Sequence, residues 1–181
     1  MTMTGCQGAL RLTALLAGLM LLLGAWPAAA KASDGWREQW HWPPAMELSH
    51  VLVQTSLYTR HFSPDPEHTD HQQLISINLH NPERWFIGFA RFKNSFSQDS
   101  HYLYAGRELP IWASGDIRVR AKLTAGALHG YRGEYRDKIP FNHYGVAPAI
   151  LPKLGASWRR LETDLTVFGT AGLIITAGIR Y

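Results

Sequence analysis

The chain has 181 residues, of which 46% are hydrophobic, 12% aromatic and 18% charged, with a formal net charge of +4. This length suits a single domain, and the abundant apolar residues exclude low-complexity disorder. The single cysteine, Cys6, excludes a disulfide scaffold. Beyond residue 30, no apolar run approaches the roughly 18 to 20 residues that a membrane-spanning helix needs. The modest charge lacks the concentrated basic footprint of nucleic-acid-binding proteins, so no nucleic-acid partner is expected.

Residues 1–30 have the layout of a secretory signal peptide. Their one charged side chain, Arg11, precedes an apolar stretch over residues 12–26, and small residues follow up to Ala30. We expect cleavage after Ala30, or else after Ala32, and export of the mature chain. The alternative is a retained membrane anchor, for which the apolar stretch is short.

Residues 31–48 are predicted to form a short amphipathic helix and a linker. A helix over residues 33–42 would end at the two prolines that follow it. Trp36 and Trp40 would share one face, because residues four apart are neighbours on a helix. Such a helix could lie at a membrane interface or pack against its own domain, and the sequence leaves both open.

From His50 onward, apolar and polar residues alternate with a period of two, which predicts β-strands. Residues 117–127 show this most clearly, with Ile117 and Leu123 on the apolar face. Eight candidate strands span residues 50–61, 73–80, 84–94, 101–112, 117–130, 148–157, 160–168 and 172–181. Most are longer than the roughly 5 to 6 residues typical of soluble domains. They match the roughly 9 to 11 residues of a tilted transmembrane strand.

The predicted connections alternate in length, as they do in outer-membrane barrels. If the N-terminus is periplasmic, three of the four outward connections are the longest in the chain, at residues 61–72, 95–100 and 131–147. Eight is an allowed strand number. The sequence therefore predicts an all-β fold, an eight-stranded antiparallel transmembrane β-barrel over residues 49–181. A soluble lipocalin-like barrel is the alternative, but no apolar face is left for a ligand cavity once the charged faces turn inward.

Charged side chains of opposite sign lie on the polar faces of two candidate strands. Arg118, Arg120 and Lys122 are on the fifth strand, and Glu162 and Asp164 are on the seventh. An unpaired charge inside a barrel is very costly. These strands are not neighbours, so the predicted ion pairs would cross the lumen. The alternative is a pair of solvated faces.

The predicted outer rim brings histidine and serine together. His61 ends the first strand, and Asn94 and Ser95 end the third. Strand ends separated by one strand lie roughly 10 Å apart, since neighbouring strands are about 4.8 Å apart, so side chains could meet. A histidine base beside a serine hydroxyl, with a carboxamide to orient the ring, is a set of catalytic groups suited to acyl transfer. His68 and His71, in the loop after the first strand, are reserve candidates for the base.

The same loop allows two other interpretations. It could bind a metal ion through His61, His68 and His71 with Asp65, Glu67 and Asp70. The spacing of these residues matches no specific ligand pattern, so no metal site is assigned. It could also be a solvated polar loop without chemistry.

Three short motifs resemble those of a known family. They are Phe92-Lys93-Asn94-Ser95-Phe96, Leu123-Thr124-Ala125-Gly126, and Pro148-Ala149-Ile150-Leu151-Pro152. They are similar to the Phe-Lys-Asp-Ser-Trp motif with its catalytic Asp and Ser, the Phe-Thr-Ala-Gly segment, and the Pro-Val-Leu-Leu-Pro stretch of the outer-membrane lipid A palmitoyltransferases (PagP type). In that family, prolines in the sixth strand mark lateral openings for lipid. Proline fits such a place because it cannot donate a ladder hydrogen bond.

Two positions depart from the family pattern. Asn94 stands where the family has Asp. Tyr58 stands where the family has its catalytic His, two residues before an Arg, and His61, directly after Arg60, is the substitute. The resemblance also places Gly106 near the floor that sets acyl-chain length.

The resemblance implies an acyltransferase that moves a palmitoyl-type chain from a phospholipid donor to lipid A in the outer membrane. His61 would be the general base, and Ser95 a participating hydroxyl or oxyanion donor oriented by Asn94. No cofactor is implied. A lipid A deacylase and a non-enzymatic small outer-membrane barrel are the alternatives.

Overall fold

The computed structural model describes residues 47–63, 69, 72–142 and 144–181. The predicted signal peptide and most of the predicted interfacial helix and linker lie outside the described residues. Within the described part of the chain, no helix is long and apolar enough to cross a membrane.

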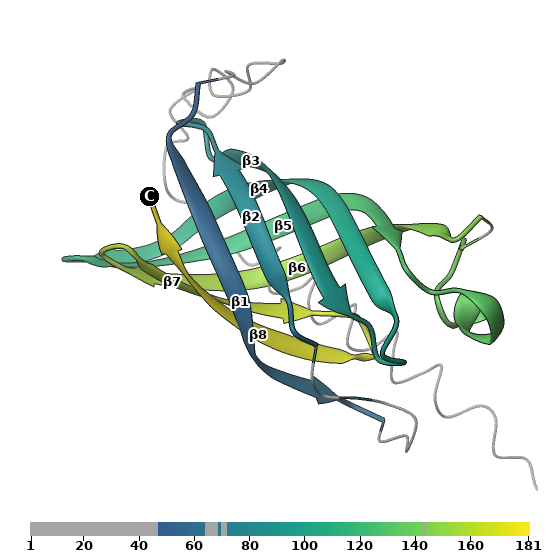
Figure 1. The fold of residues 1–181 in the computed structure, drawn as a ribbon. Helices are drawn as coiled ribbons and strands as arrows, with labels where there is room; N and C mark the ends of the chain where they lie inside the picture. The colour runs from purple at the N-terminus through teal and green to yellow at the C-terminus, as the bar shows by residue number, and fades with distance from the viewer. Residues whose placement is uncertain (1–46, 64–68, 70–71, 143) are drawn as a thin grey trace, which may run out of the picture. The chain divides into compact units, whose positions relative to one another are not determined.

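Eight antiparallel strands close into a barrel (Figure 1). They are β1 (His50–His61), β2 (Ile75–His80), β3 (Trp85–Lys93), β4 (Asp99–Ser114), β5 (Ile117–His129), β6 (Val146–Trp158), β7 (Leu161–Val167) and β8 (Gly172–Arg180). Each strand pairs with the next in the chain, and β8 pairs with β1. A short 3-10 helix, η1 (Gly133–Lys138), lies between β5 and β6. The predicted all-β, eight-stranded antiparallel barrel is confirmed.

Some strand bounds differ from the prediction. β2 begins at Ile75 rather than at residue 73, β4 extends to Ser114 rather than to residue 112, and β6 begins at Val146 rather than at residue 148. β4 is longer than predicted because its ladder with β5 continues to the tip of the hairpin, where Ser114 pairs with Ile117.

The two ends of the barrel differ in their connections. One end, here called the loop end, holds the long connections β1–β2, β3–β4 and β5–β6 and the short connection β7–β8. The other, here called the turn end, holds the three tight turns β2–β3, β4–β5 and β6–β7 together with the C-terminus. The predicted asymmetry of the connections is therefore present.

The outward face of the barrel is apolar. Large apolar side chains with a third or more of their surface exposed include Val53, Ile77, Ile87, Leu103, Leu123, Ile150, Leu154 and Ile179. Aromatic residues lie near the turn end: Trp85 begins β3, Trp158 ends β6, and Tyr181 directly follows β8. An apolar band edged by aromatic side chains is the surface that a transmembrane barrel presents to lipid.

The inward face near the turn end is filled by an ion-pair network. Arg120 lies 2.9 Å from Glu162 and 3.4 Å from Glu108, and Lys122 contacts Glu162 and lies 2.9 Å from Asp164. These contacts join β5 to β7 across the lumen, as the sequence predicts. Arg118 is exposed and stands outside this network.

Candidate functional site

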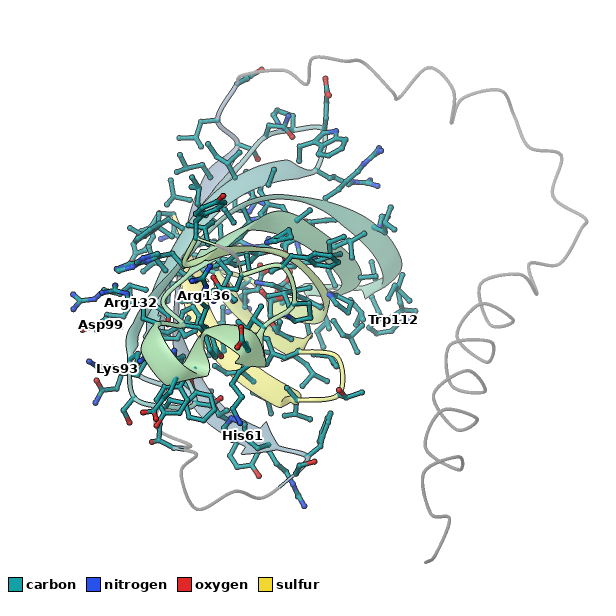
Figure 2. All side chains as sticks on the ribbon, turned by 90° about the vertical axis from the view of Figure 1, so that its right-hand side faces the viewer. His61, Lys93, Asp99, Trp112, Arg132 and Arg136 are labelled. Carbon is teal, nitrogen blue, oxygen red and sulfur yellow. The ribbon has the colours of Figure 1, made fainter. Side chains whose placement is uncertain are left out.

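The site is centred on a contact between two strand ends at the loop end. The Nε2 atom of His61, the last residue of β1, lies 2.8 Å from the Oγ atom of Ser95, which follows β3. Figure 2 shows His61 at the end of the barrel where η1 lies. The structure thus brings together the two side chains that the sequence pairs, and their role in catalysis stays a prediction.

A bulge in β1 turns His61 toward the interior. Pairing of β1 with β8 shifts register between Ser56 and Tyr58. Such an extra residue reverses the alternation of faces, so both Gln54 and Thr59 are buried. His61 follows Thr59 by two residues and shares its face. Without the bulge, His61 would face lipid.

The side chain of Tyr58 does not face the interior of the barrel, so Tyr58 does not occupy the position that a catalytic base would need. Its side chain is 51% exposed, at the bulge. The predicted use of His61 instead of this position is therefore consistent with the geometry. His68 and His71, the reserve candidates, lie outside the described residues.

Ser95 is held by its backbone and by a partly buried tyrosine, Tyr131. The Ser95 carbonyl oxygen accepts a hydrogen bond of 2.9 Å from the Thr69 amide. Burial raises the pKa of Tyr131, and the hydrogen bond between its side chain and that of Ser95 acts in the opposite direction. The phenol is therefore neutral at ordinary pH and can donate a hydrogen bond. Tyr131 was not singled out from sequence, because nothing in the β5–β6 loop signals that it folds back onto Ser95.

Asn94 supports the turn that carries Ser95. Its side chain is buried, with 1% exposed, and its Oδ1 atom accepts hydrogen bonds from the backbone amides of Phe96 (2.9 Å) and Gln98 (3.0 Å). Its Nδ2 atom lies 3.4 Å from the carbonyl oxygen of Gly130. The carboxamide thus acts within the β3–β4 turn and does not orient the ring of His61. Asn94 thus supports the position of Ser95, in line with the expectation that it orients Ser95, and its role in catalysis stays a prediction.

A cavity of about 700 Å³ extends from this pair into the barrel. Its wall is largely apolar, with Leu74, Ala90, Phe92, Tyr102, Leu128, Leu151 and Ile174. The expectation that no apolar face is left for a ligand cavity is therefore wrong. The charged inward residues gather near the turn end, and farther along the same strands the inward positions become apolar or aromatic.

The inner end of the cavity is polar. Gln54, Ser76, Tyr104, Lys153 and Thr176 line it. The Lys153 ammonium lies 5.2 Å from the centroid of the Tyr104 ring, and no carboxylate of the described residues contacts it. Gly106 does not line the cavity, because the Phe86 ring occupies the space beside its Cα. The resemblance places Gly106 near the floor, and the structure shows that Gly106 itself is not part of the cavity wall.

The barrel wall is incompletely paired beside the cavity. Pairing between β6 and β7 ends at Lys153 and Thr166. Residues 146–152 of β6 pair only with β5 among the described residues. Pro148 and Pro152, which lack an N–H group, lie in this unpaired edge. Ile150, from the same edge, lines the cavity although its side chain is 68% exposed, so the cavity reaches the outer surface here.

Basic side chains surround the mouth of the cavity. Arg60 and Lys138 line it. Lys93, Arg132 and Arg136 lie at the same end, as Figure 2 shows. Near them, Lys93 pairs with Asp99 at 3.1 Å. Among the described residues there is no group of three or more side chains suited to hold a metal ion.

Comparisons with known proteins add little to this geometry. No family model matches the chain, and no curated protein matches it in sequence. Among solved structures, the outer membrane protein Ail of Yersinia pestis, whose backbone was determined in a phospholipid bilayer nanodisc, is similar with a TM-score of 0.40 and 11% sequence identity. The match covers 75% of this chain and 100% of the Ail chain. This likeness is too weak to carry an argument about function.

Proposed function

We propose that the protein is an outer-membrane acyltransferase that moves a palmitoyl-type acyl chain from a phospholipid to lipid A. One observation carries the proposal: the His61–Ser95 pair, 2.8 Å apart, stands at the mouth of an apolar cavity inside a barrel. A reactive polar pair above an apolar tube suits an ester whose acyl chain occupies the tube. The motif resemblance supports lipid A as the acceptor.

The unpaired edge of β6 supports a lipid donor. A membrane phospholipid must pass between strands, because the closed parts of a barrel wall leave no gap for an acyl chain. The edge at Pro148 and Pro152 has no β7 partner among the described residues and leads to the cavity. A chain entering here would place its ester toward the loop end, where Ser95 lies.

The chemistry needs one base and donors for an oxyanion. In the proposed step, His61 accepts the proton of an acceptor hydroxyl as its oxygen attacks the ester carbonyl. The hydroxyls of Ser95 and Tyr131 would donate hydrogen bonds to the resulting oxyanion. Collapse breaks the bond to the donor's glycerol oxygen, which takes the proton from His61. The products are acylated lipid A and a lysophospholipid.

The polar floor supports a chain of limited length. The apolar wall ends at Lys153 and Tyr104, and an alkyl chain gains nothing by passing an ammonium group. The basic side chains around the mouth, including Arg60 and Lys138, suit the negatively charged groups of the acceptor.

Lipid A mass spectrometry tests the proposal. Cells that express the protein should show lipid A heavier by one acyl chain, and His61→Ala or Ser95→Ala should remove this species. His101→Ala is the matched control, because this ring lies on the outer surface at the same end, stacked on Phe89 at 5.8 Å. It should keep the added chain.

Two results would point to the alternatives. A deacylase would give lipid A that is lighter by one chain, with the same dependence on His61. A non-enzymatic barrel would leave every lipid unchanged, with or without the alanine variants, and the proposed function would then be wrong.

A further inference from the structure

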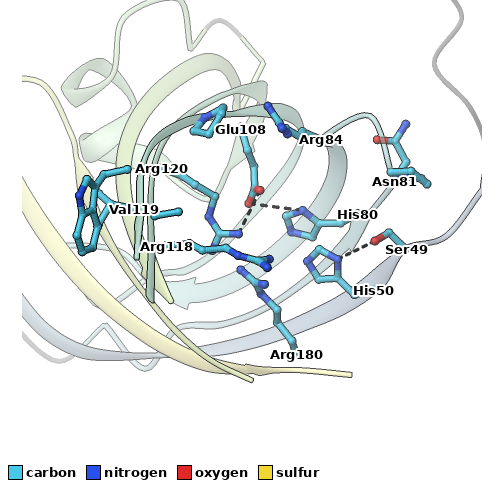
Figure 3. Close-up of a pocket in the computed structure, with 14 residues that line it drawn as sticks. Ser49, His50, His80, Asn81, Arg84, Glu108, Arg118, Val119, Arg120 and Arg180 are labelled. Carbon is cyan, nitrogen blue, oxygen red and sulfur yellow. Dashed lines mark hydrogen bonds and ion pairs between the residues drawn. The ribbon is translucent and has the colours of Figure 1, made fainter. Parts of the chain in front are cut away.

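A second cavity, of about 540 Å³, opens at the turn end, away from the His61–Ser95 pair (Figure 3). Four arginines line it: Arg84, Arg118, Arg120 and Arg180. The rings of His50 and His80 complete one side. Glu108 is the one carboxylate among its lining residues. The cavity is therefore strongly basic, which the proposed acyl transfer does not explain.

Among the described residues, two of the four arginines, Arg84 and Arg118, have no counter-charge. The buried network contains three cations and three carboxylates: Arg120, Lys122 and Arg180 with Glu108, Glu162 and Asp164. These charges balance one another. In the described part of the chain, no carboxylate contacts the guanidinium group of Arg84 or Arg118. The cavity therefore carries a surplus of two positive charges.

The histidines add unpartnered polar atoms. His80 is 2% exposed, and its ring is fixed by stacking on His50 (4.3 Å) and Phe86 (4.7 Å). Neither ring nitrogen of His80 has a hydrogen-bond partner among the described residues, and the nearest carboxylate oxygen, of Glu108, is 3.7 Å from Nδ1. The Nε2 atom of His50 is also buried, and it has no hydrogen-bond partner within the part of the chain that the structure describes. Buried polar atoms in native proteins are normally satisfied, so these atoms mark room for a polar ligand.

We propose that this cavity is a binding site for a phosphate-class oxyanion. Arg84 and Arg118 would supply the two charges that a phosphate dianion needs, and guanidinium groups bind phosphate oxygens in a bidentate manner. A ring N–H of His50 or His80 can donate a further hydrogen bond. The ligand is either a free phosphate or phosphomonoester, or the phosphate headgroup of an anionic lipid at this face of the membrane.

Phosphate titration of the purified chain, folded in zwitterionic detergent micelles, tests the site. Binding of inorganic phosphate is followed by calorimetry at low ionic strength. The double variant Arg84→Gln/Arg118→Gln should bind phosphate about 100-fold more weakly, since each charged hydrogen-bond donor contributes roughly tenfold. Arg160→Gln is the matched control, because this exposed arginine lies in the β6–β7 turn at the same end and does not line the cavity.

The outcomes separate clearly. The proposal is overturned if the wild-type chain does not bind phosphate, or if the double variant binds it as well as Arg160→Gln does. Both replaced arginines are exposed, so the barrel should stay folded, and an unchanged unfolding temperature verifies this. Lipid A acylation is read separately, so failure of one proposal leaves the other standing.

A competition experiment identifies the source of the phosphate group. A short-chain phosphatidylglycerol that displaces inorganic phosphate, where phosphatidylcholine does not, would identify an anionic lipid headgroup as the ligand. Binding of inorganic phosphate that neither lipid displaces would identify a free anion.

Discussion

At the scale of single residues, the candidate site depends on two backbone features that position its side chains. The β1 bulge turns His61 inward, and the turn after β3 presents Ser95 to it. Asn94 belongs to the second feature, since its Oδ1 atom satisfies two backbone amides in that turn. A substitution of Asn94 should therefore reduce activity to the extent that it disturbs this turn.

Substitutions of Asn94 distinguish positioning from chemistry. Asn94→Ala removes both acceptor bonds and leaves two amides without their partner, so we expect a loss of about 1 to 3 kcal/mol in the free energy of unfolding, together with reduced acyl transfer. Asn94→Asp keeps an acceptor for both amides but brings an oxygen toward the Gly130 carbonyl, so its losses should be smaller. Urea unfolding and lipid A acylation are measured on the same preparations. If Asn94→Asp lost all activity at full stability, a direct catalytic role would replace the positioning role.

The sequence predicted part of this site for physical reasons that are clear at the residue level. Strand order alone put the ends of β1 and β3 close together, which was enough to pair His61 with Ser95. Neither Tyr131 nor Lys153 could be placed in this way. Tyr131 reaches Ser95 through the fold of a long loop, and the isolation of Lys153 depends on which charges cross the lumen.

At the scale of strands, the alternation of inward and outward residues was the reliable signal. It held along β5 and β8. In β8, Ile174 is an apolar residue on the otherwise polar inward face that it shares with Thr176, and it is buried in the interior with 2% exposed. The alternation says nothing about the change from charged to apolar along one inward face. For that reason, the sequence did not predict the apolar cavity.

The charge network that joins β5, β7 and β8 should contribute strongly to stability. Glu162 is 2% exposed and contacts Arg120, Lys122 and Arg180. Glu162→Gln leaves buried cations without their counter-charge, and we expect it to lower the free energy of unfolding by about 3 to 5 kcal/mol.

An exposed ion pair at the turn end is the control for this effect. Asp116 lies 3.0 Å from Arg159, and both side chains are more than half exposed. Asp116→Asn should cost no more than about 1 kcal/mol. Both variants are compared by urea unfolding in the same detergent. Equal effects of the two substitutions would show that burial of the network does not strengthen it.

At the scale of the whole molecule, the barrel has an apolar outside, a charged plug near the turn end and an apolar cavity near the loop end. This arrangement separates the two proposed sites by the ion-pair network. An acyl chain that enters through the unpaired edge of β6 meets Lys153 before it reaches the network, and an anion at the turn end meets Arg84 and Arg118. The two proposals can therefore be tested independently on one protein.

The position of the barrel in a bilayer gives a prediction that depends on depth. Ile87, in the apolar outward row of β3 between Trp85 and Phe89, is 58% exposed, whereas Ile117, 45% exposed, is the first residue after the β4–β5 turn. An arginine at the bilayer midplane costs about 2 to 4 kcal/mol, and one near the interface about 0 to 1 kcal/mol. We therefore expect Ile87→Arg to destabilise the folded barrel in lipid vesicles far more than Ile117→Arg does, as measured by urea unfolding. In a soluble barrel both residues would face water, so equal and small effects would contradict a membrane-spanning barrel and remove the physical basis for a lipid substrate.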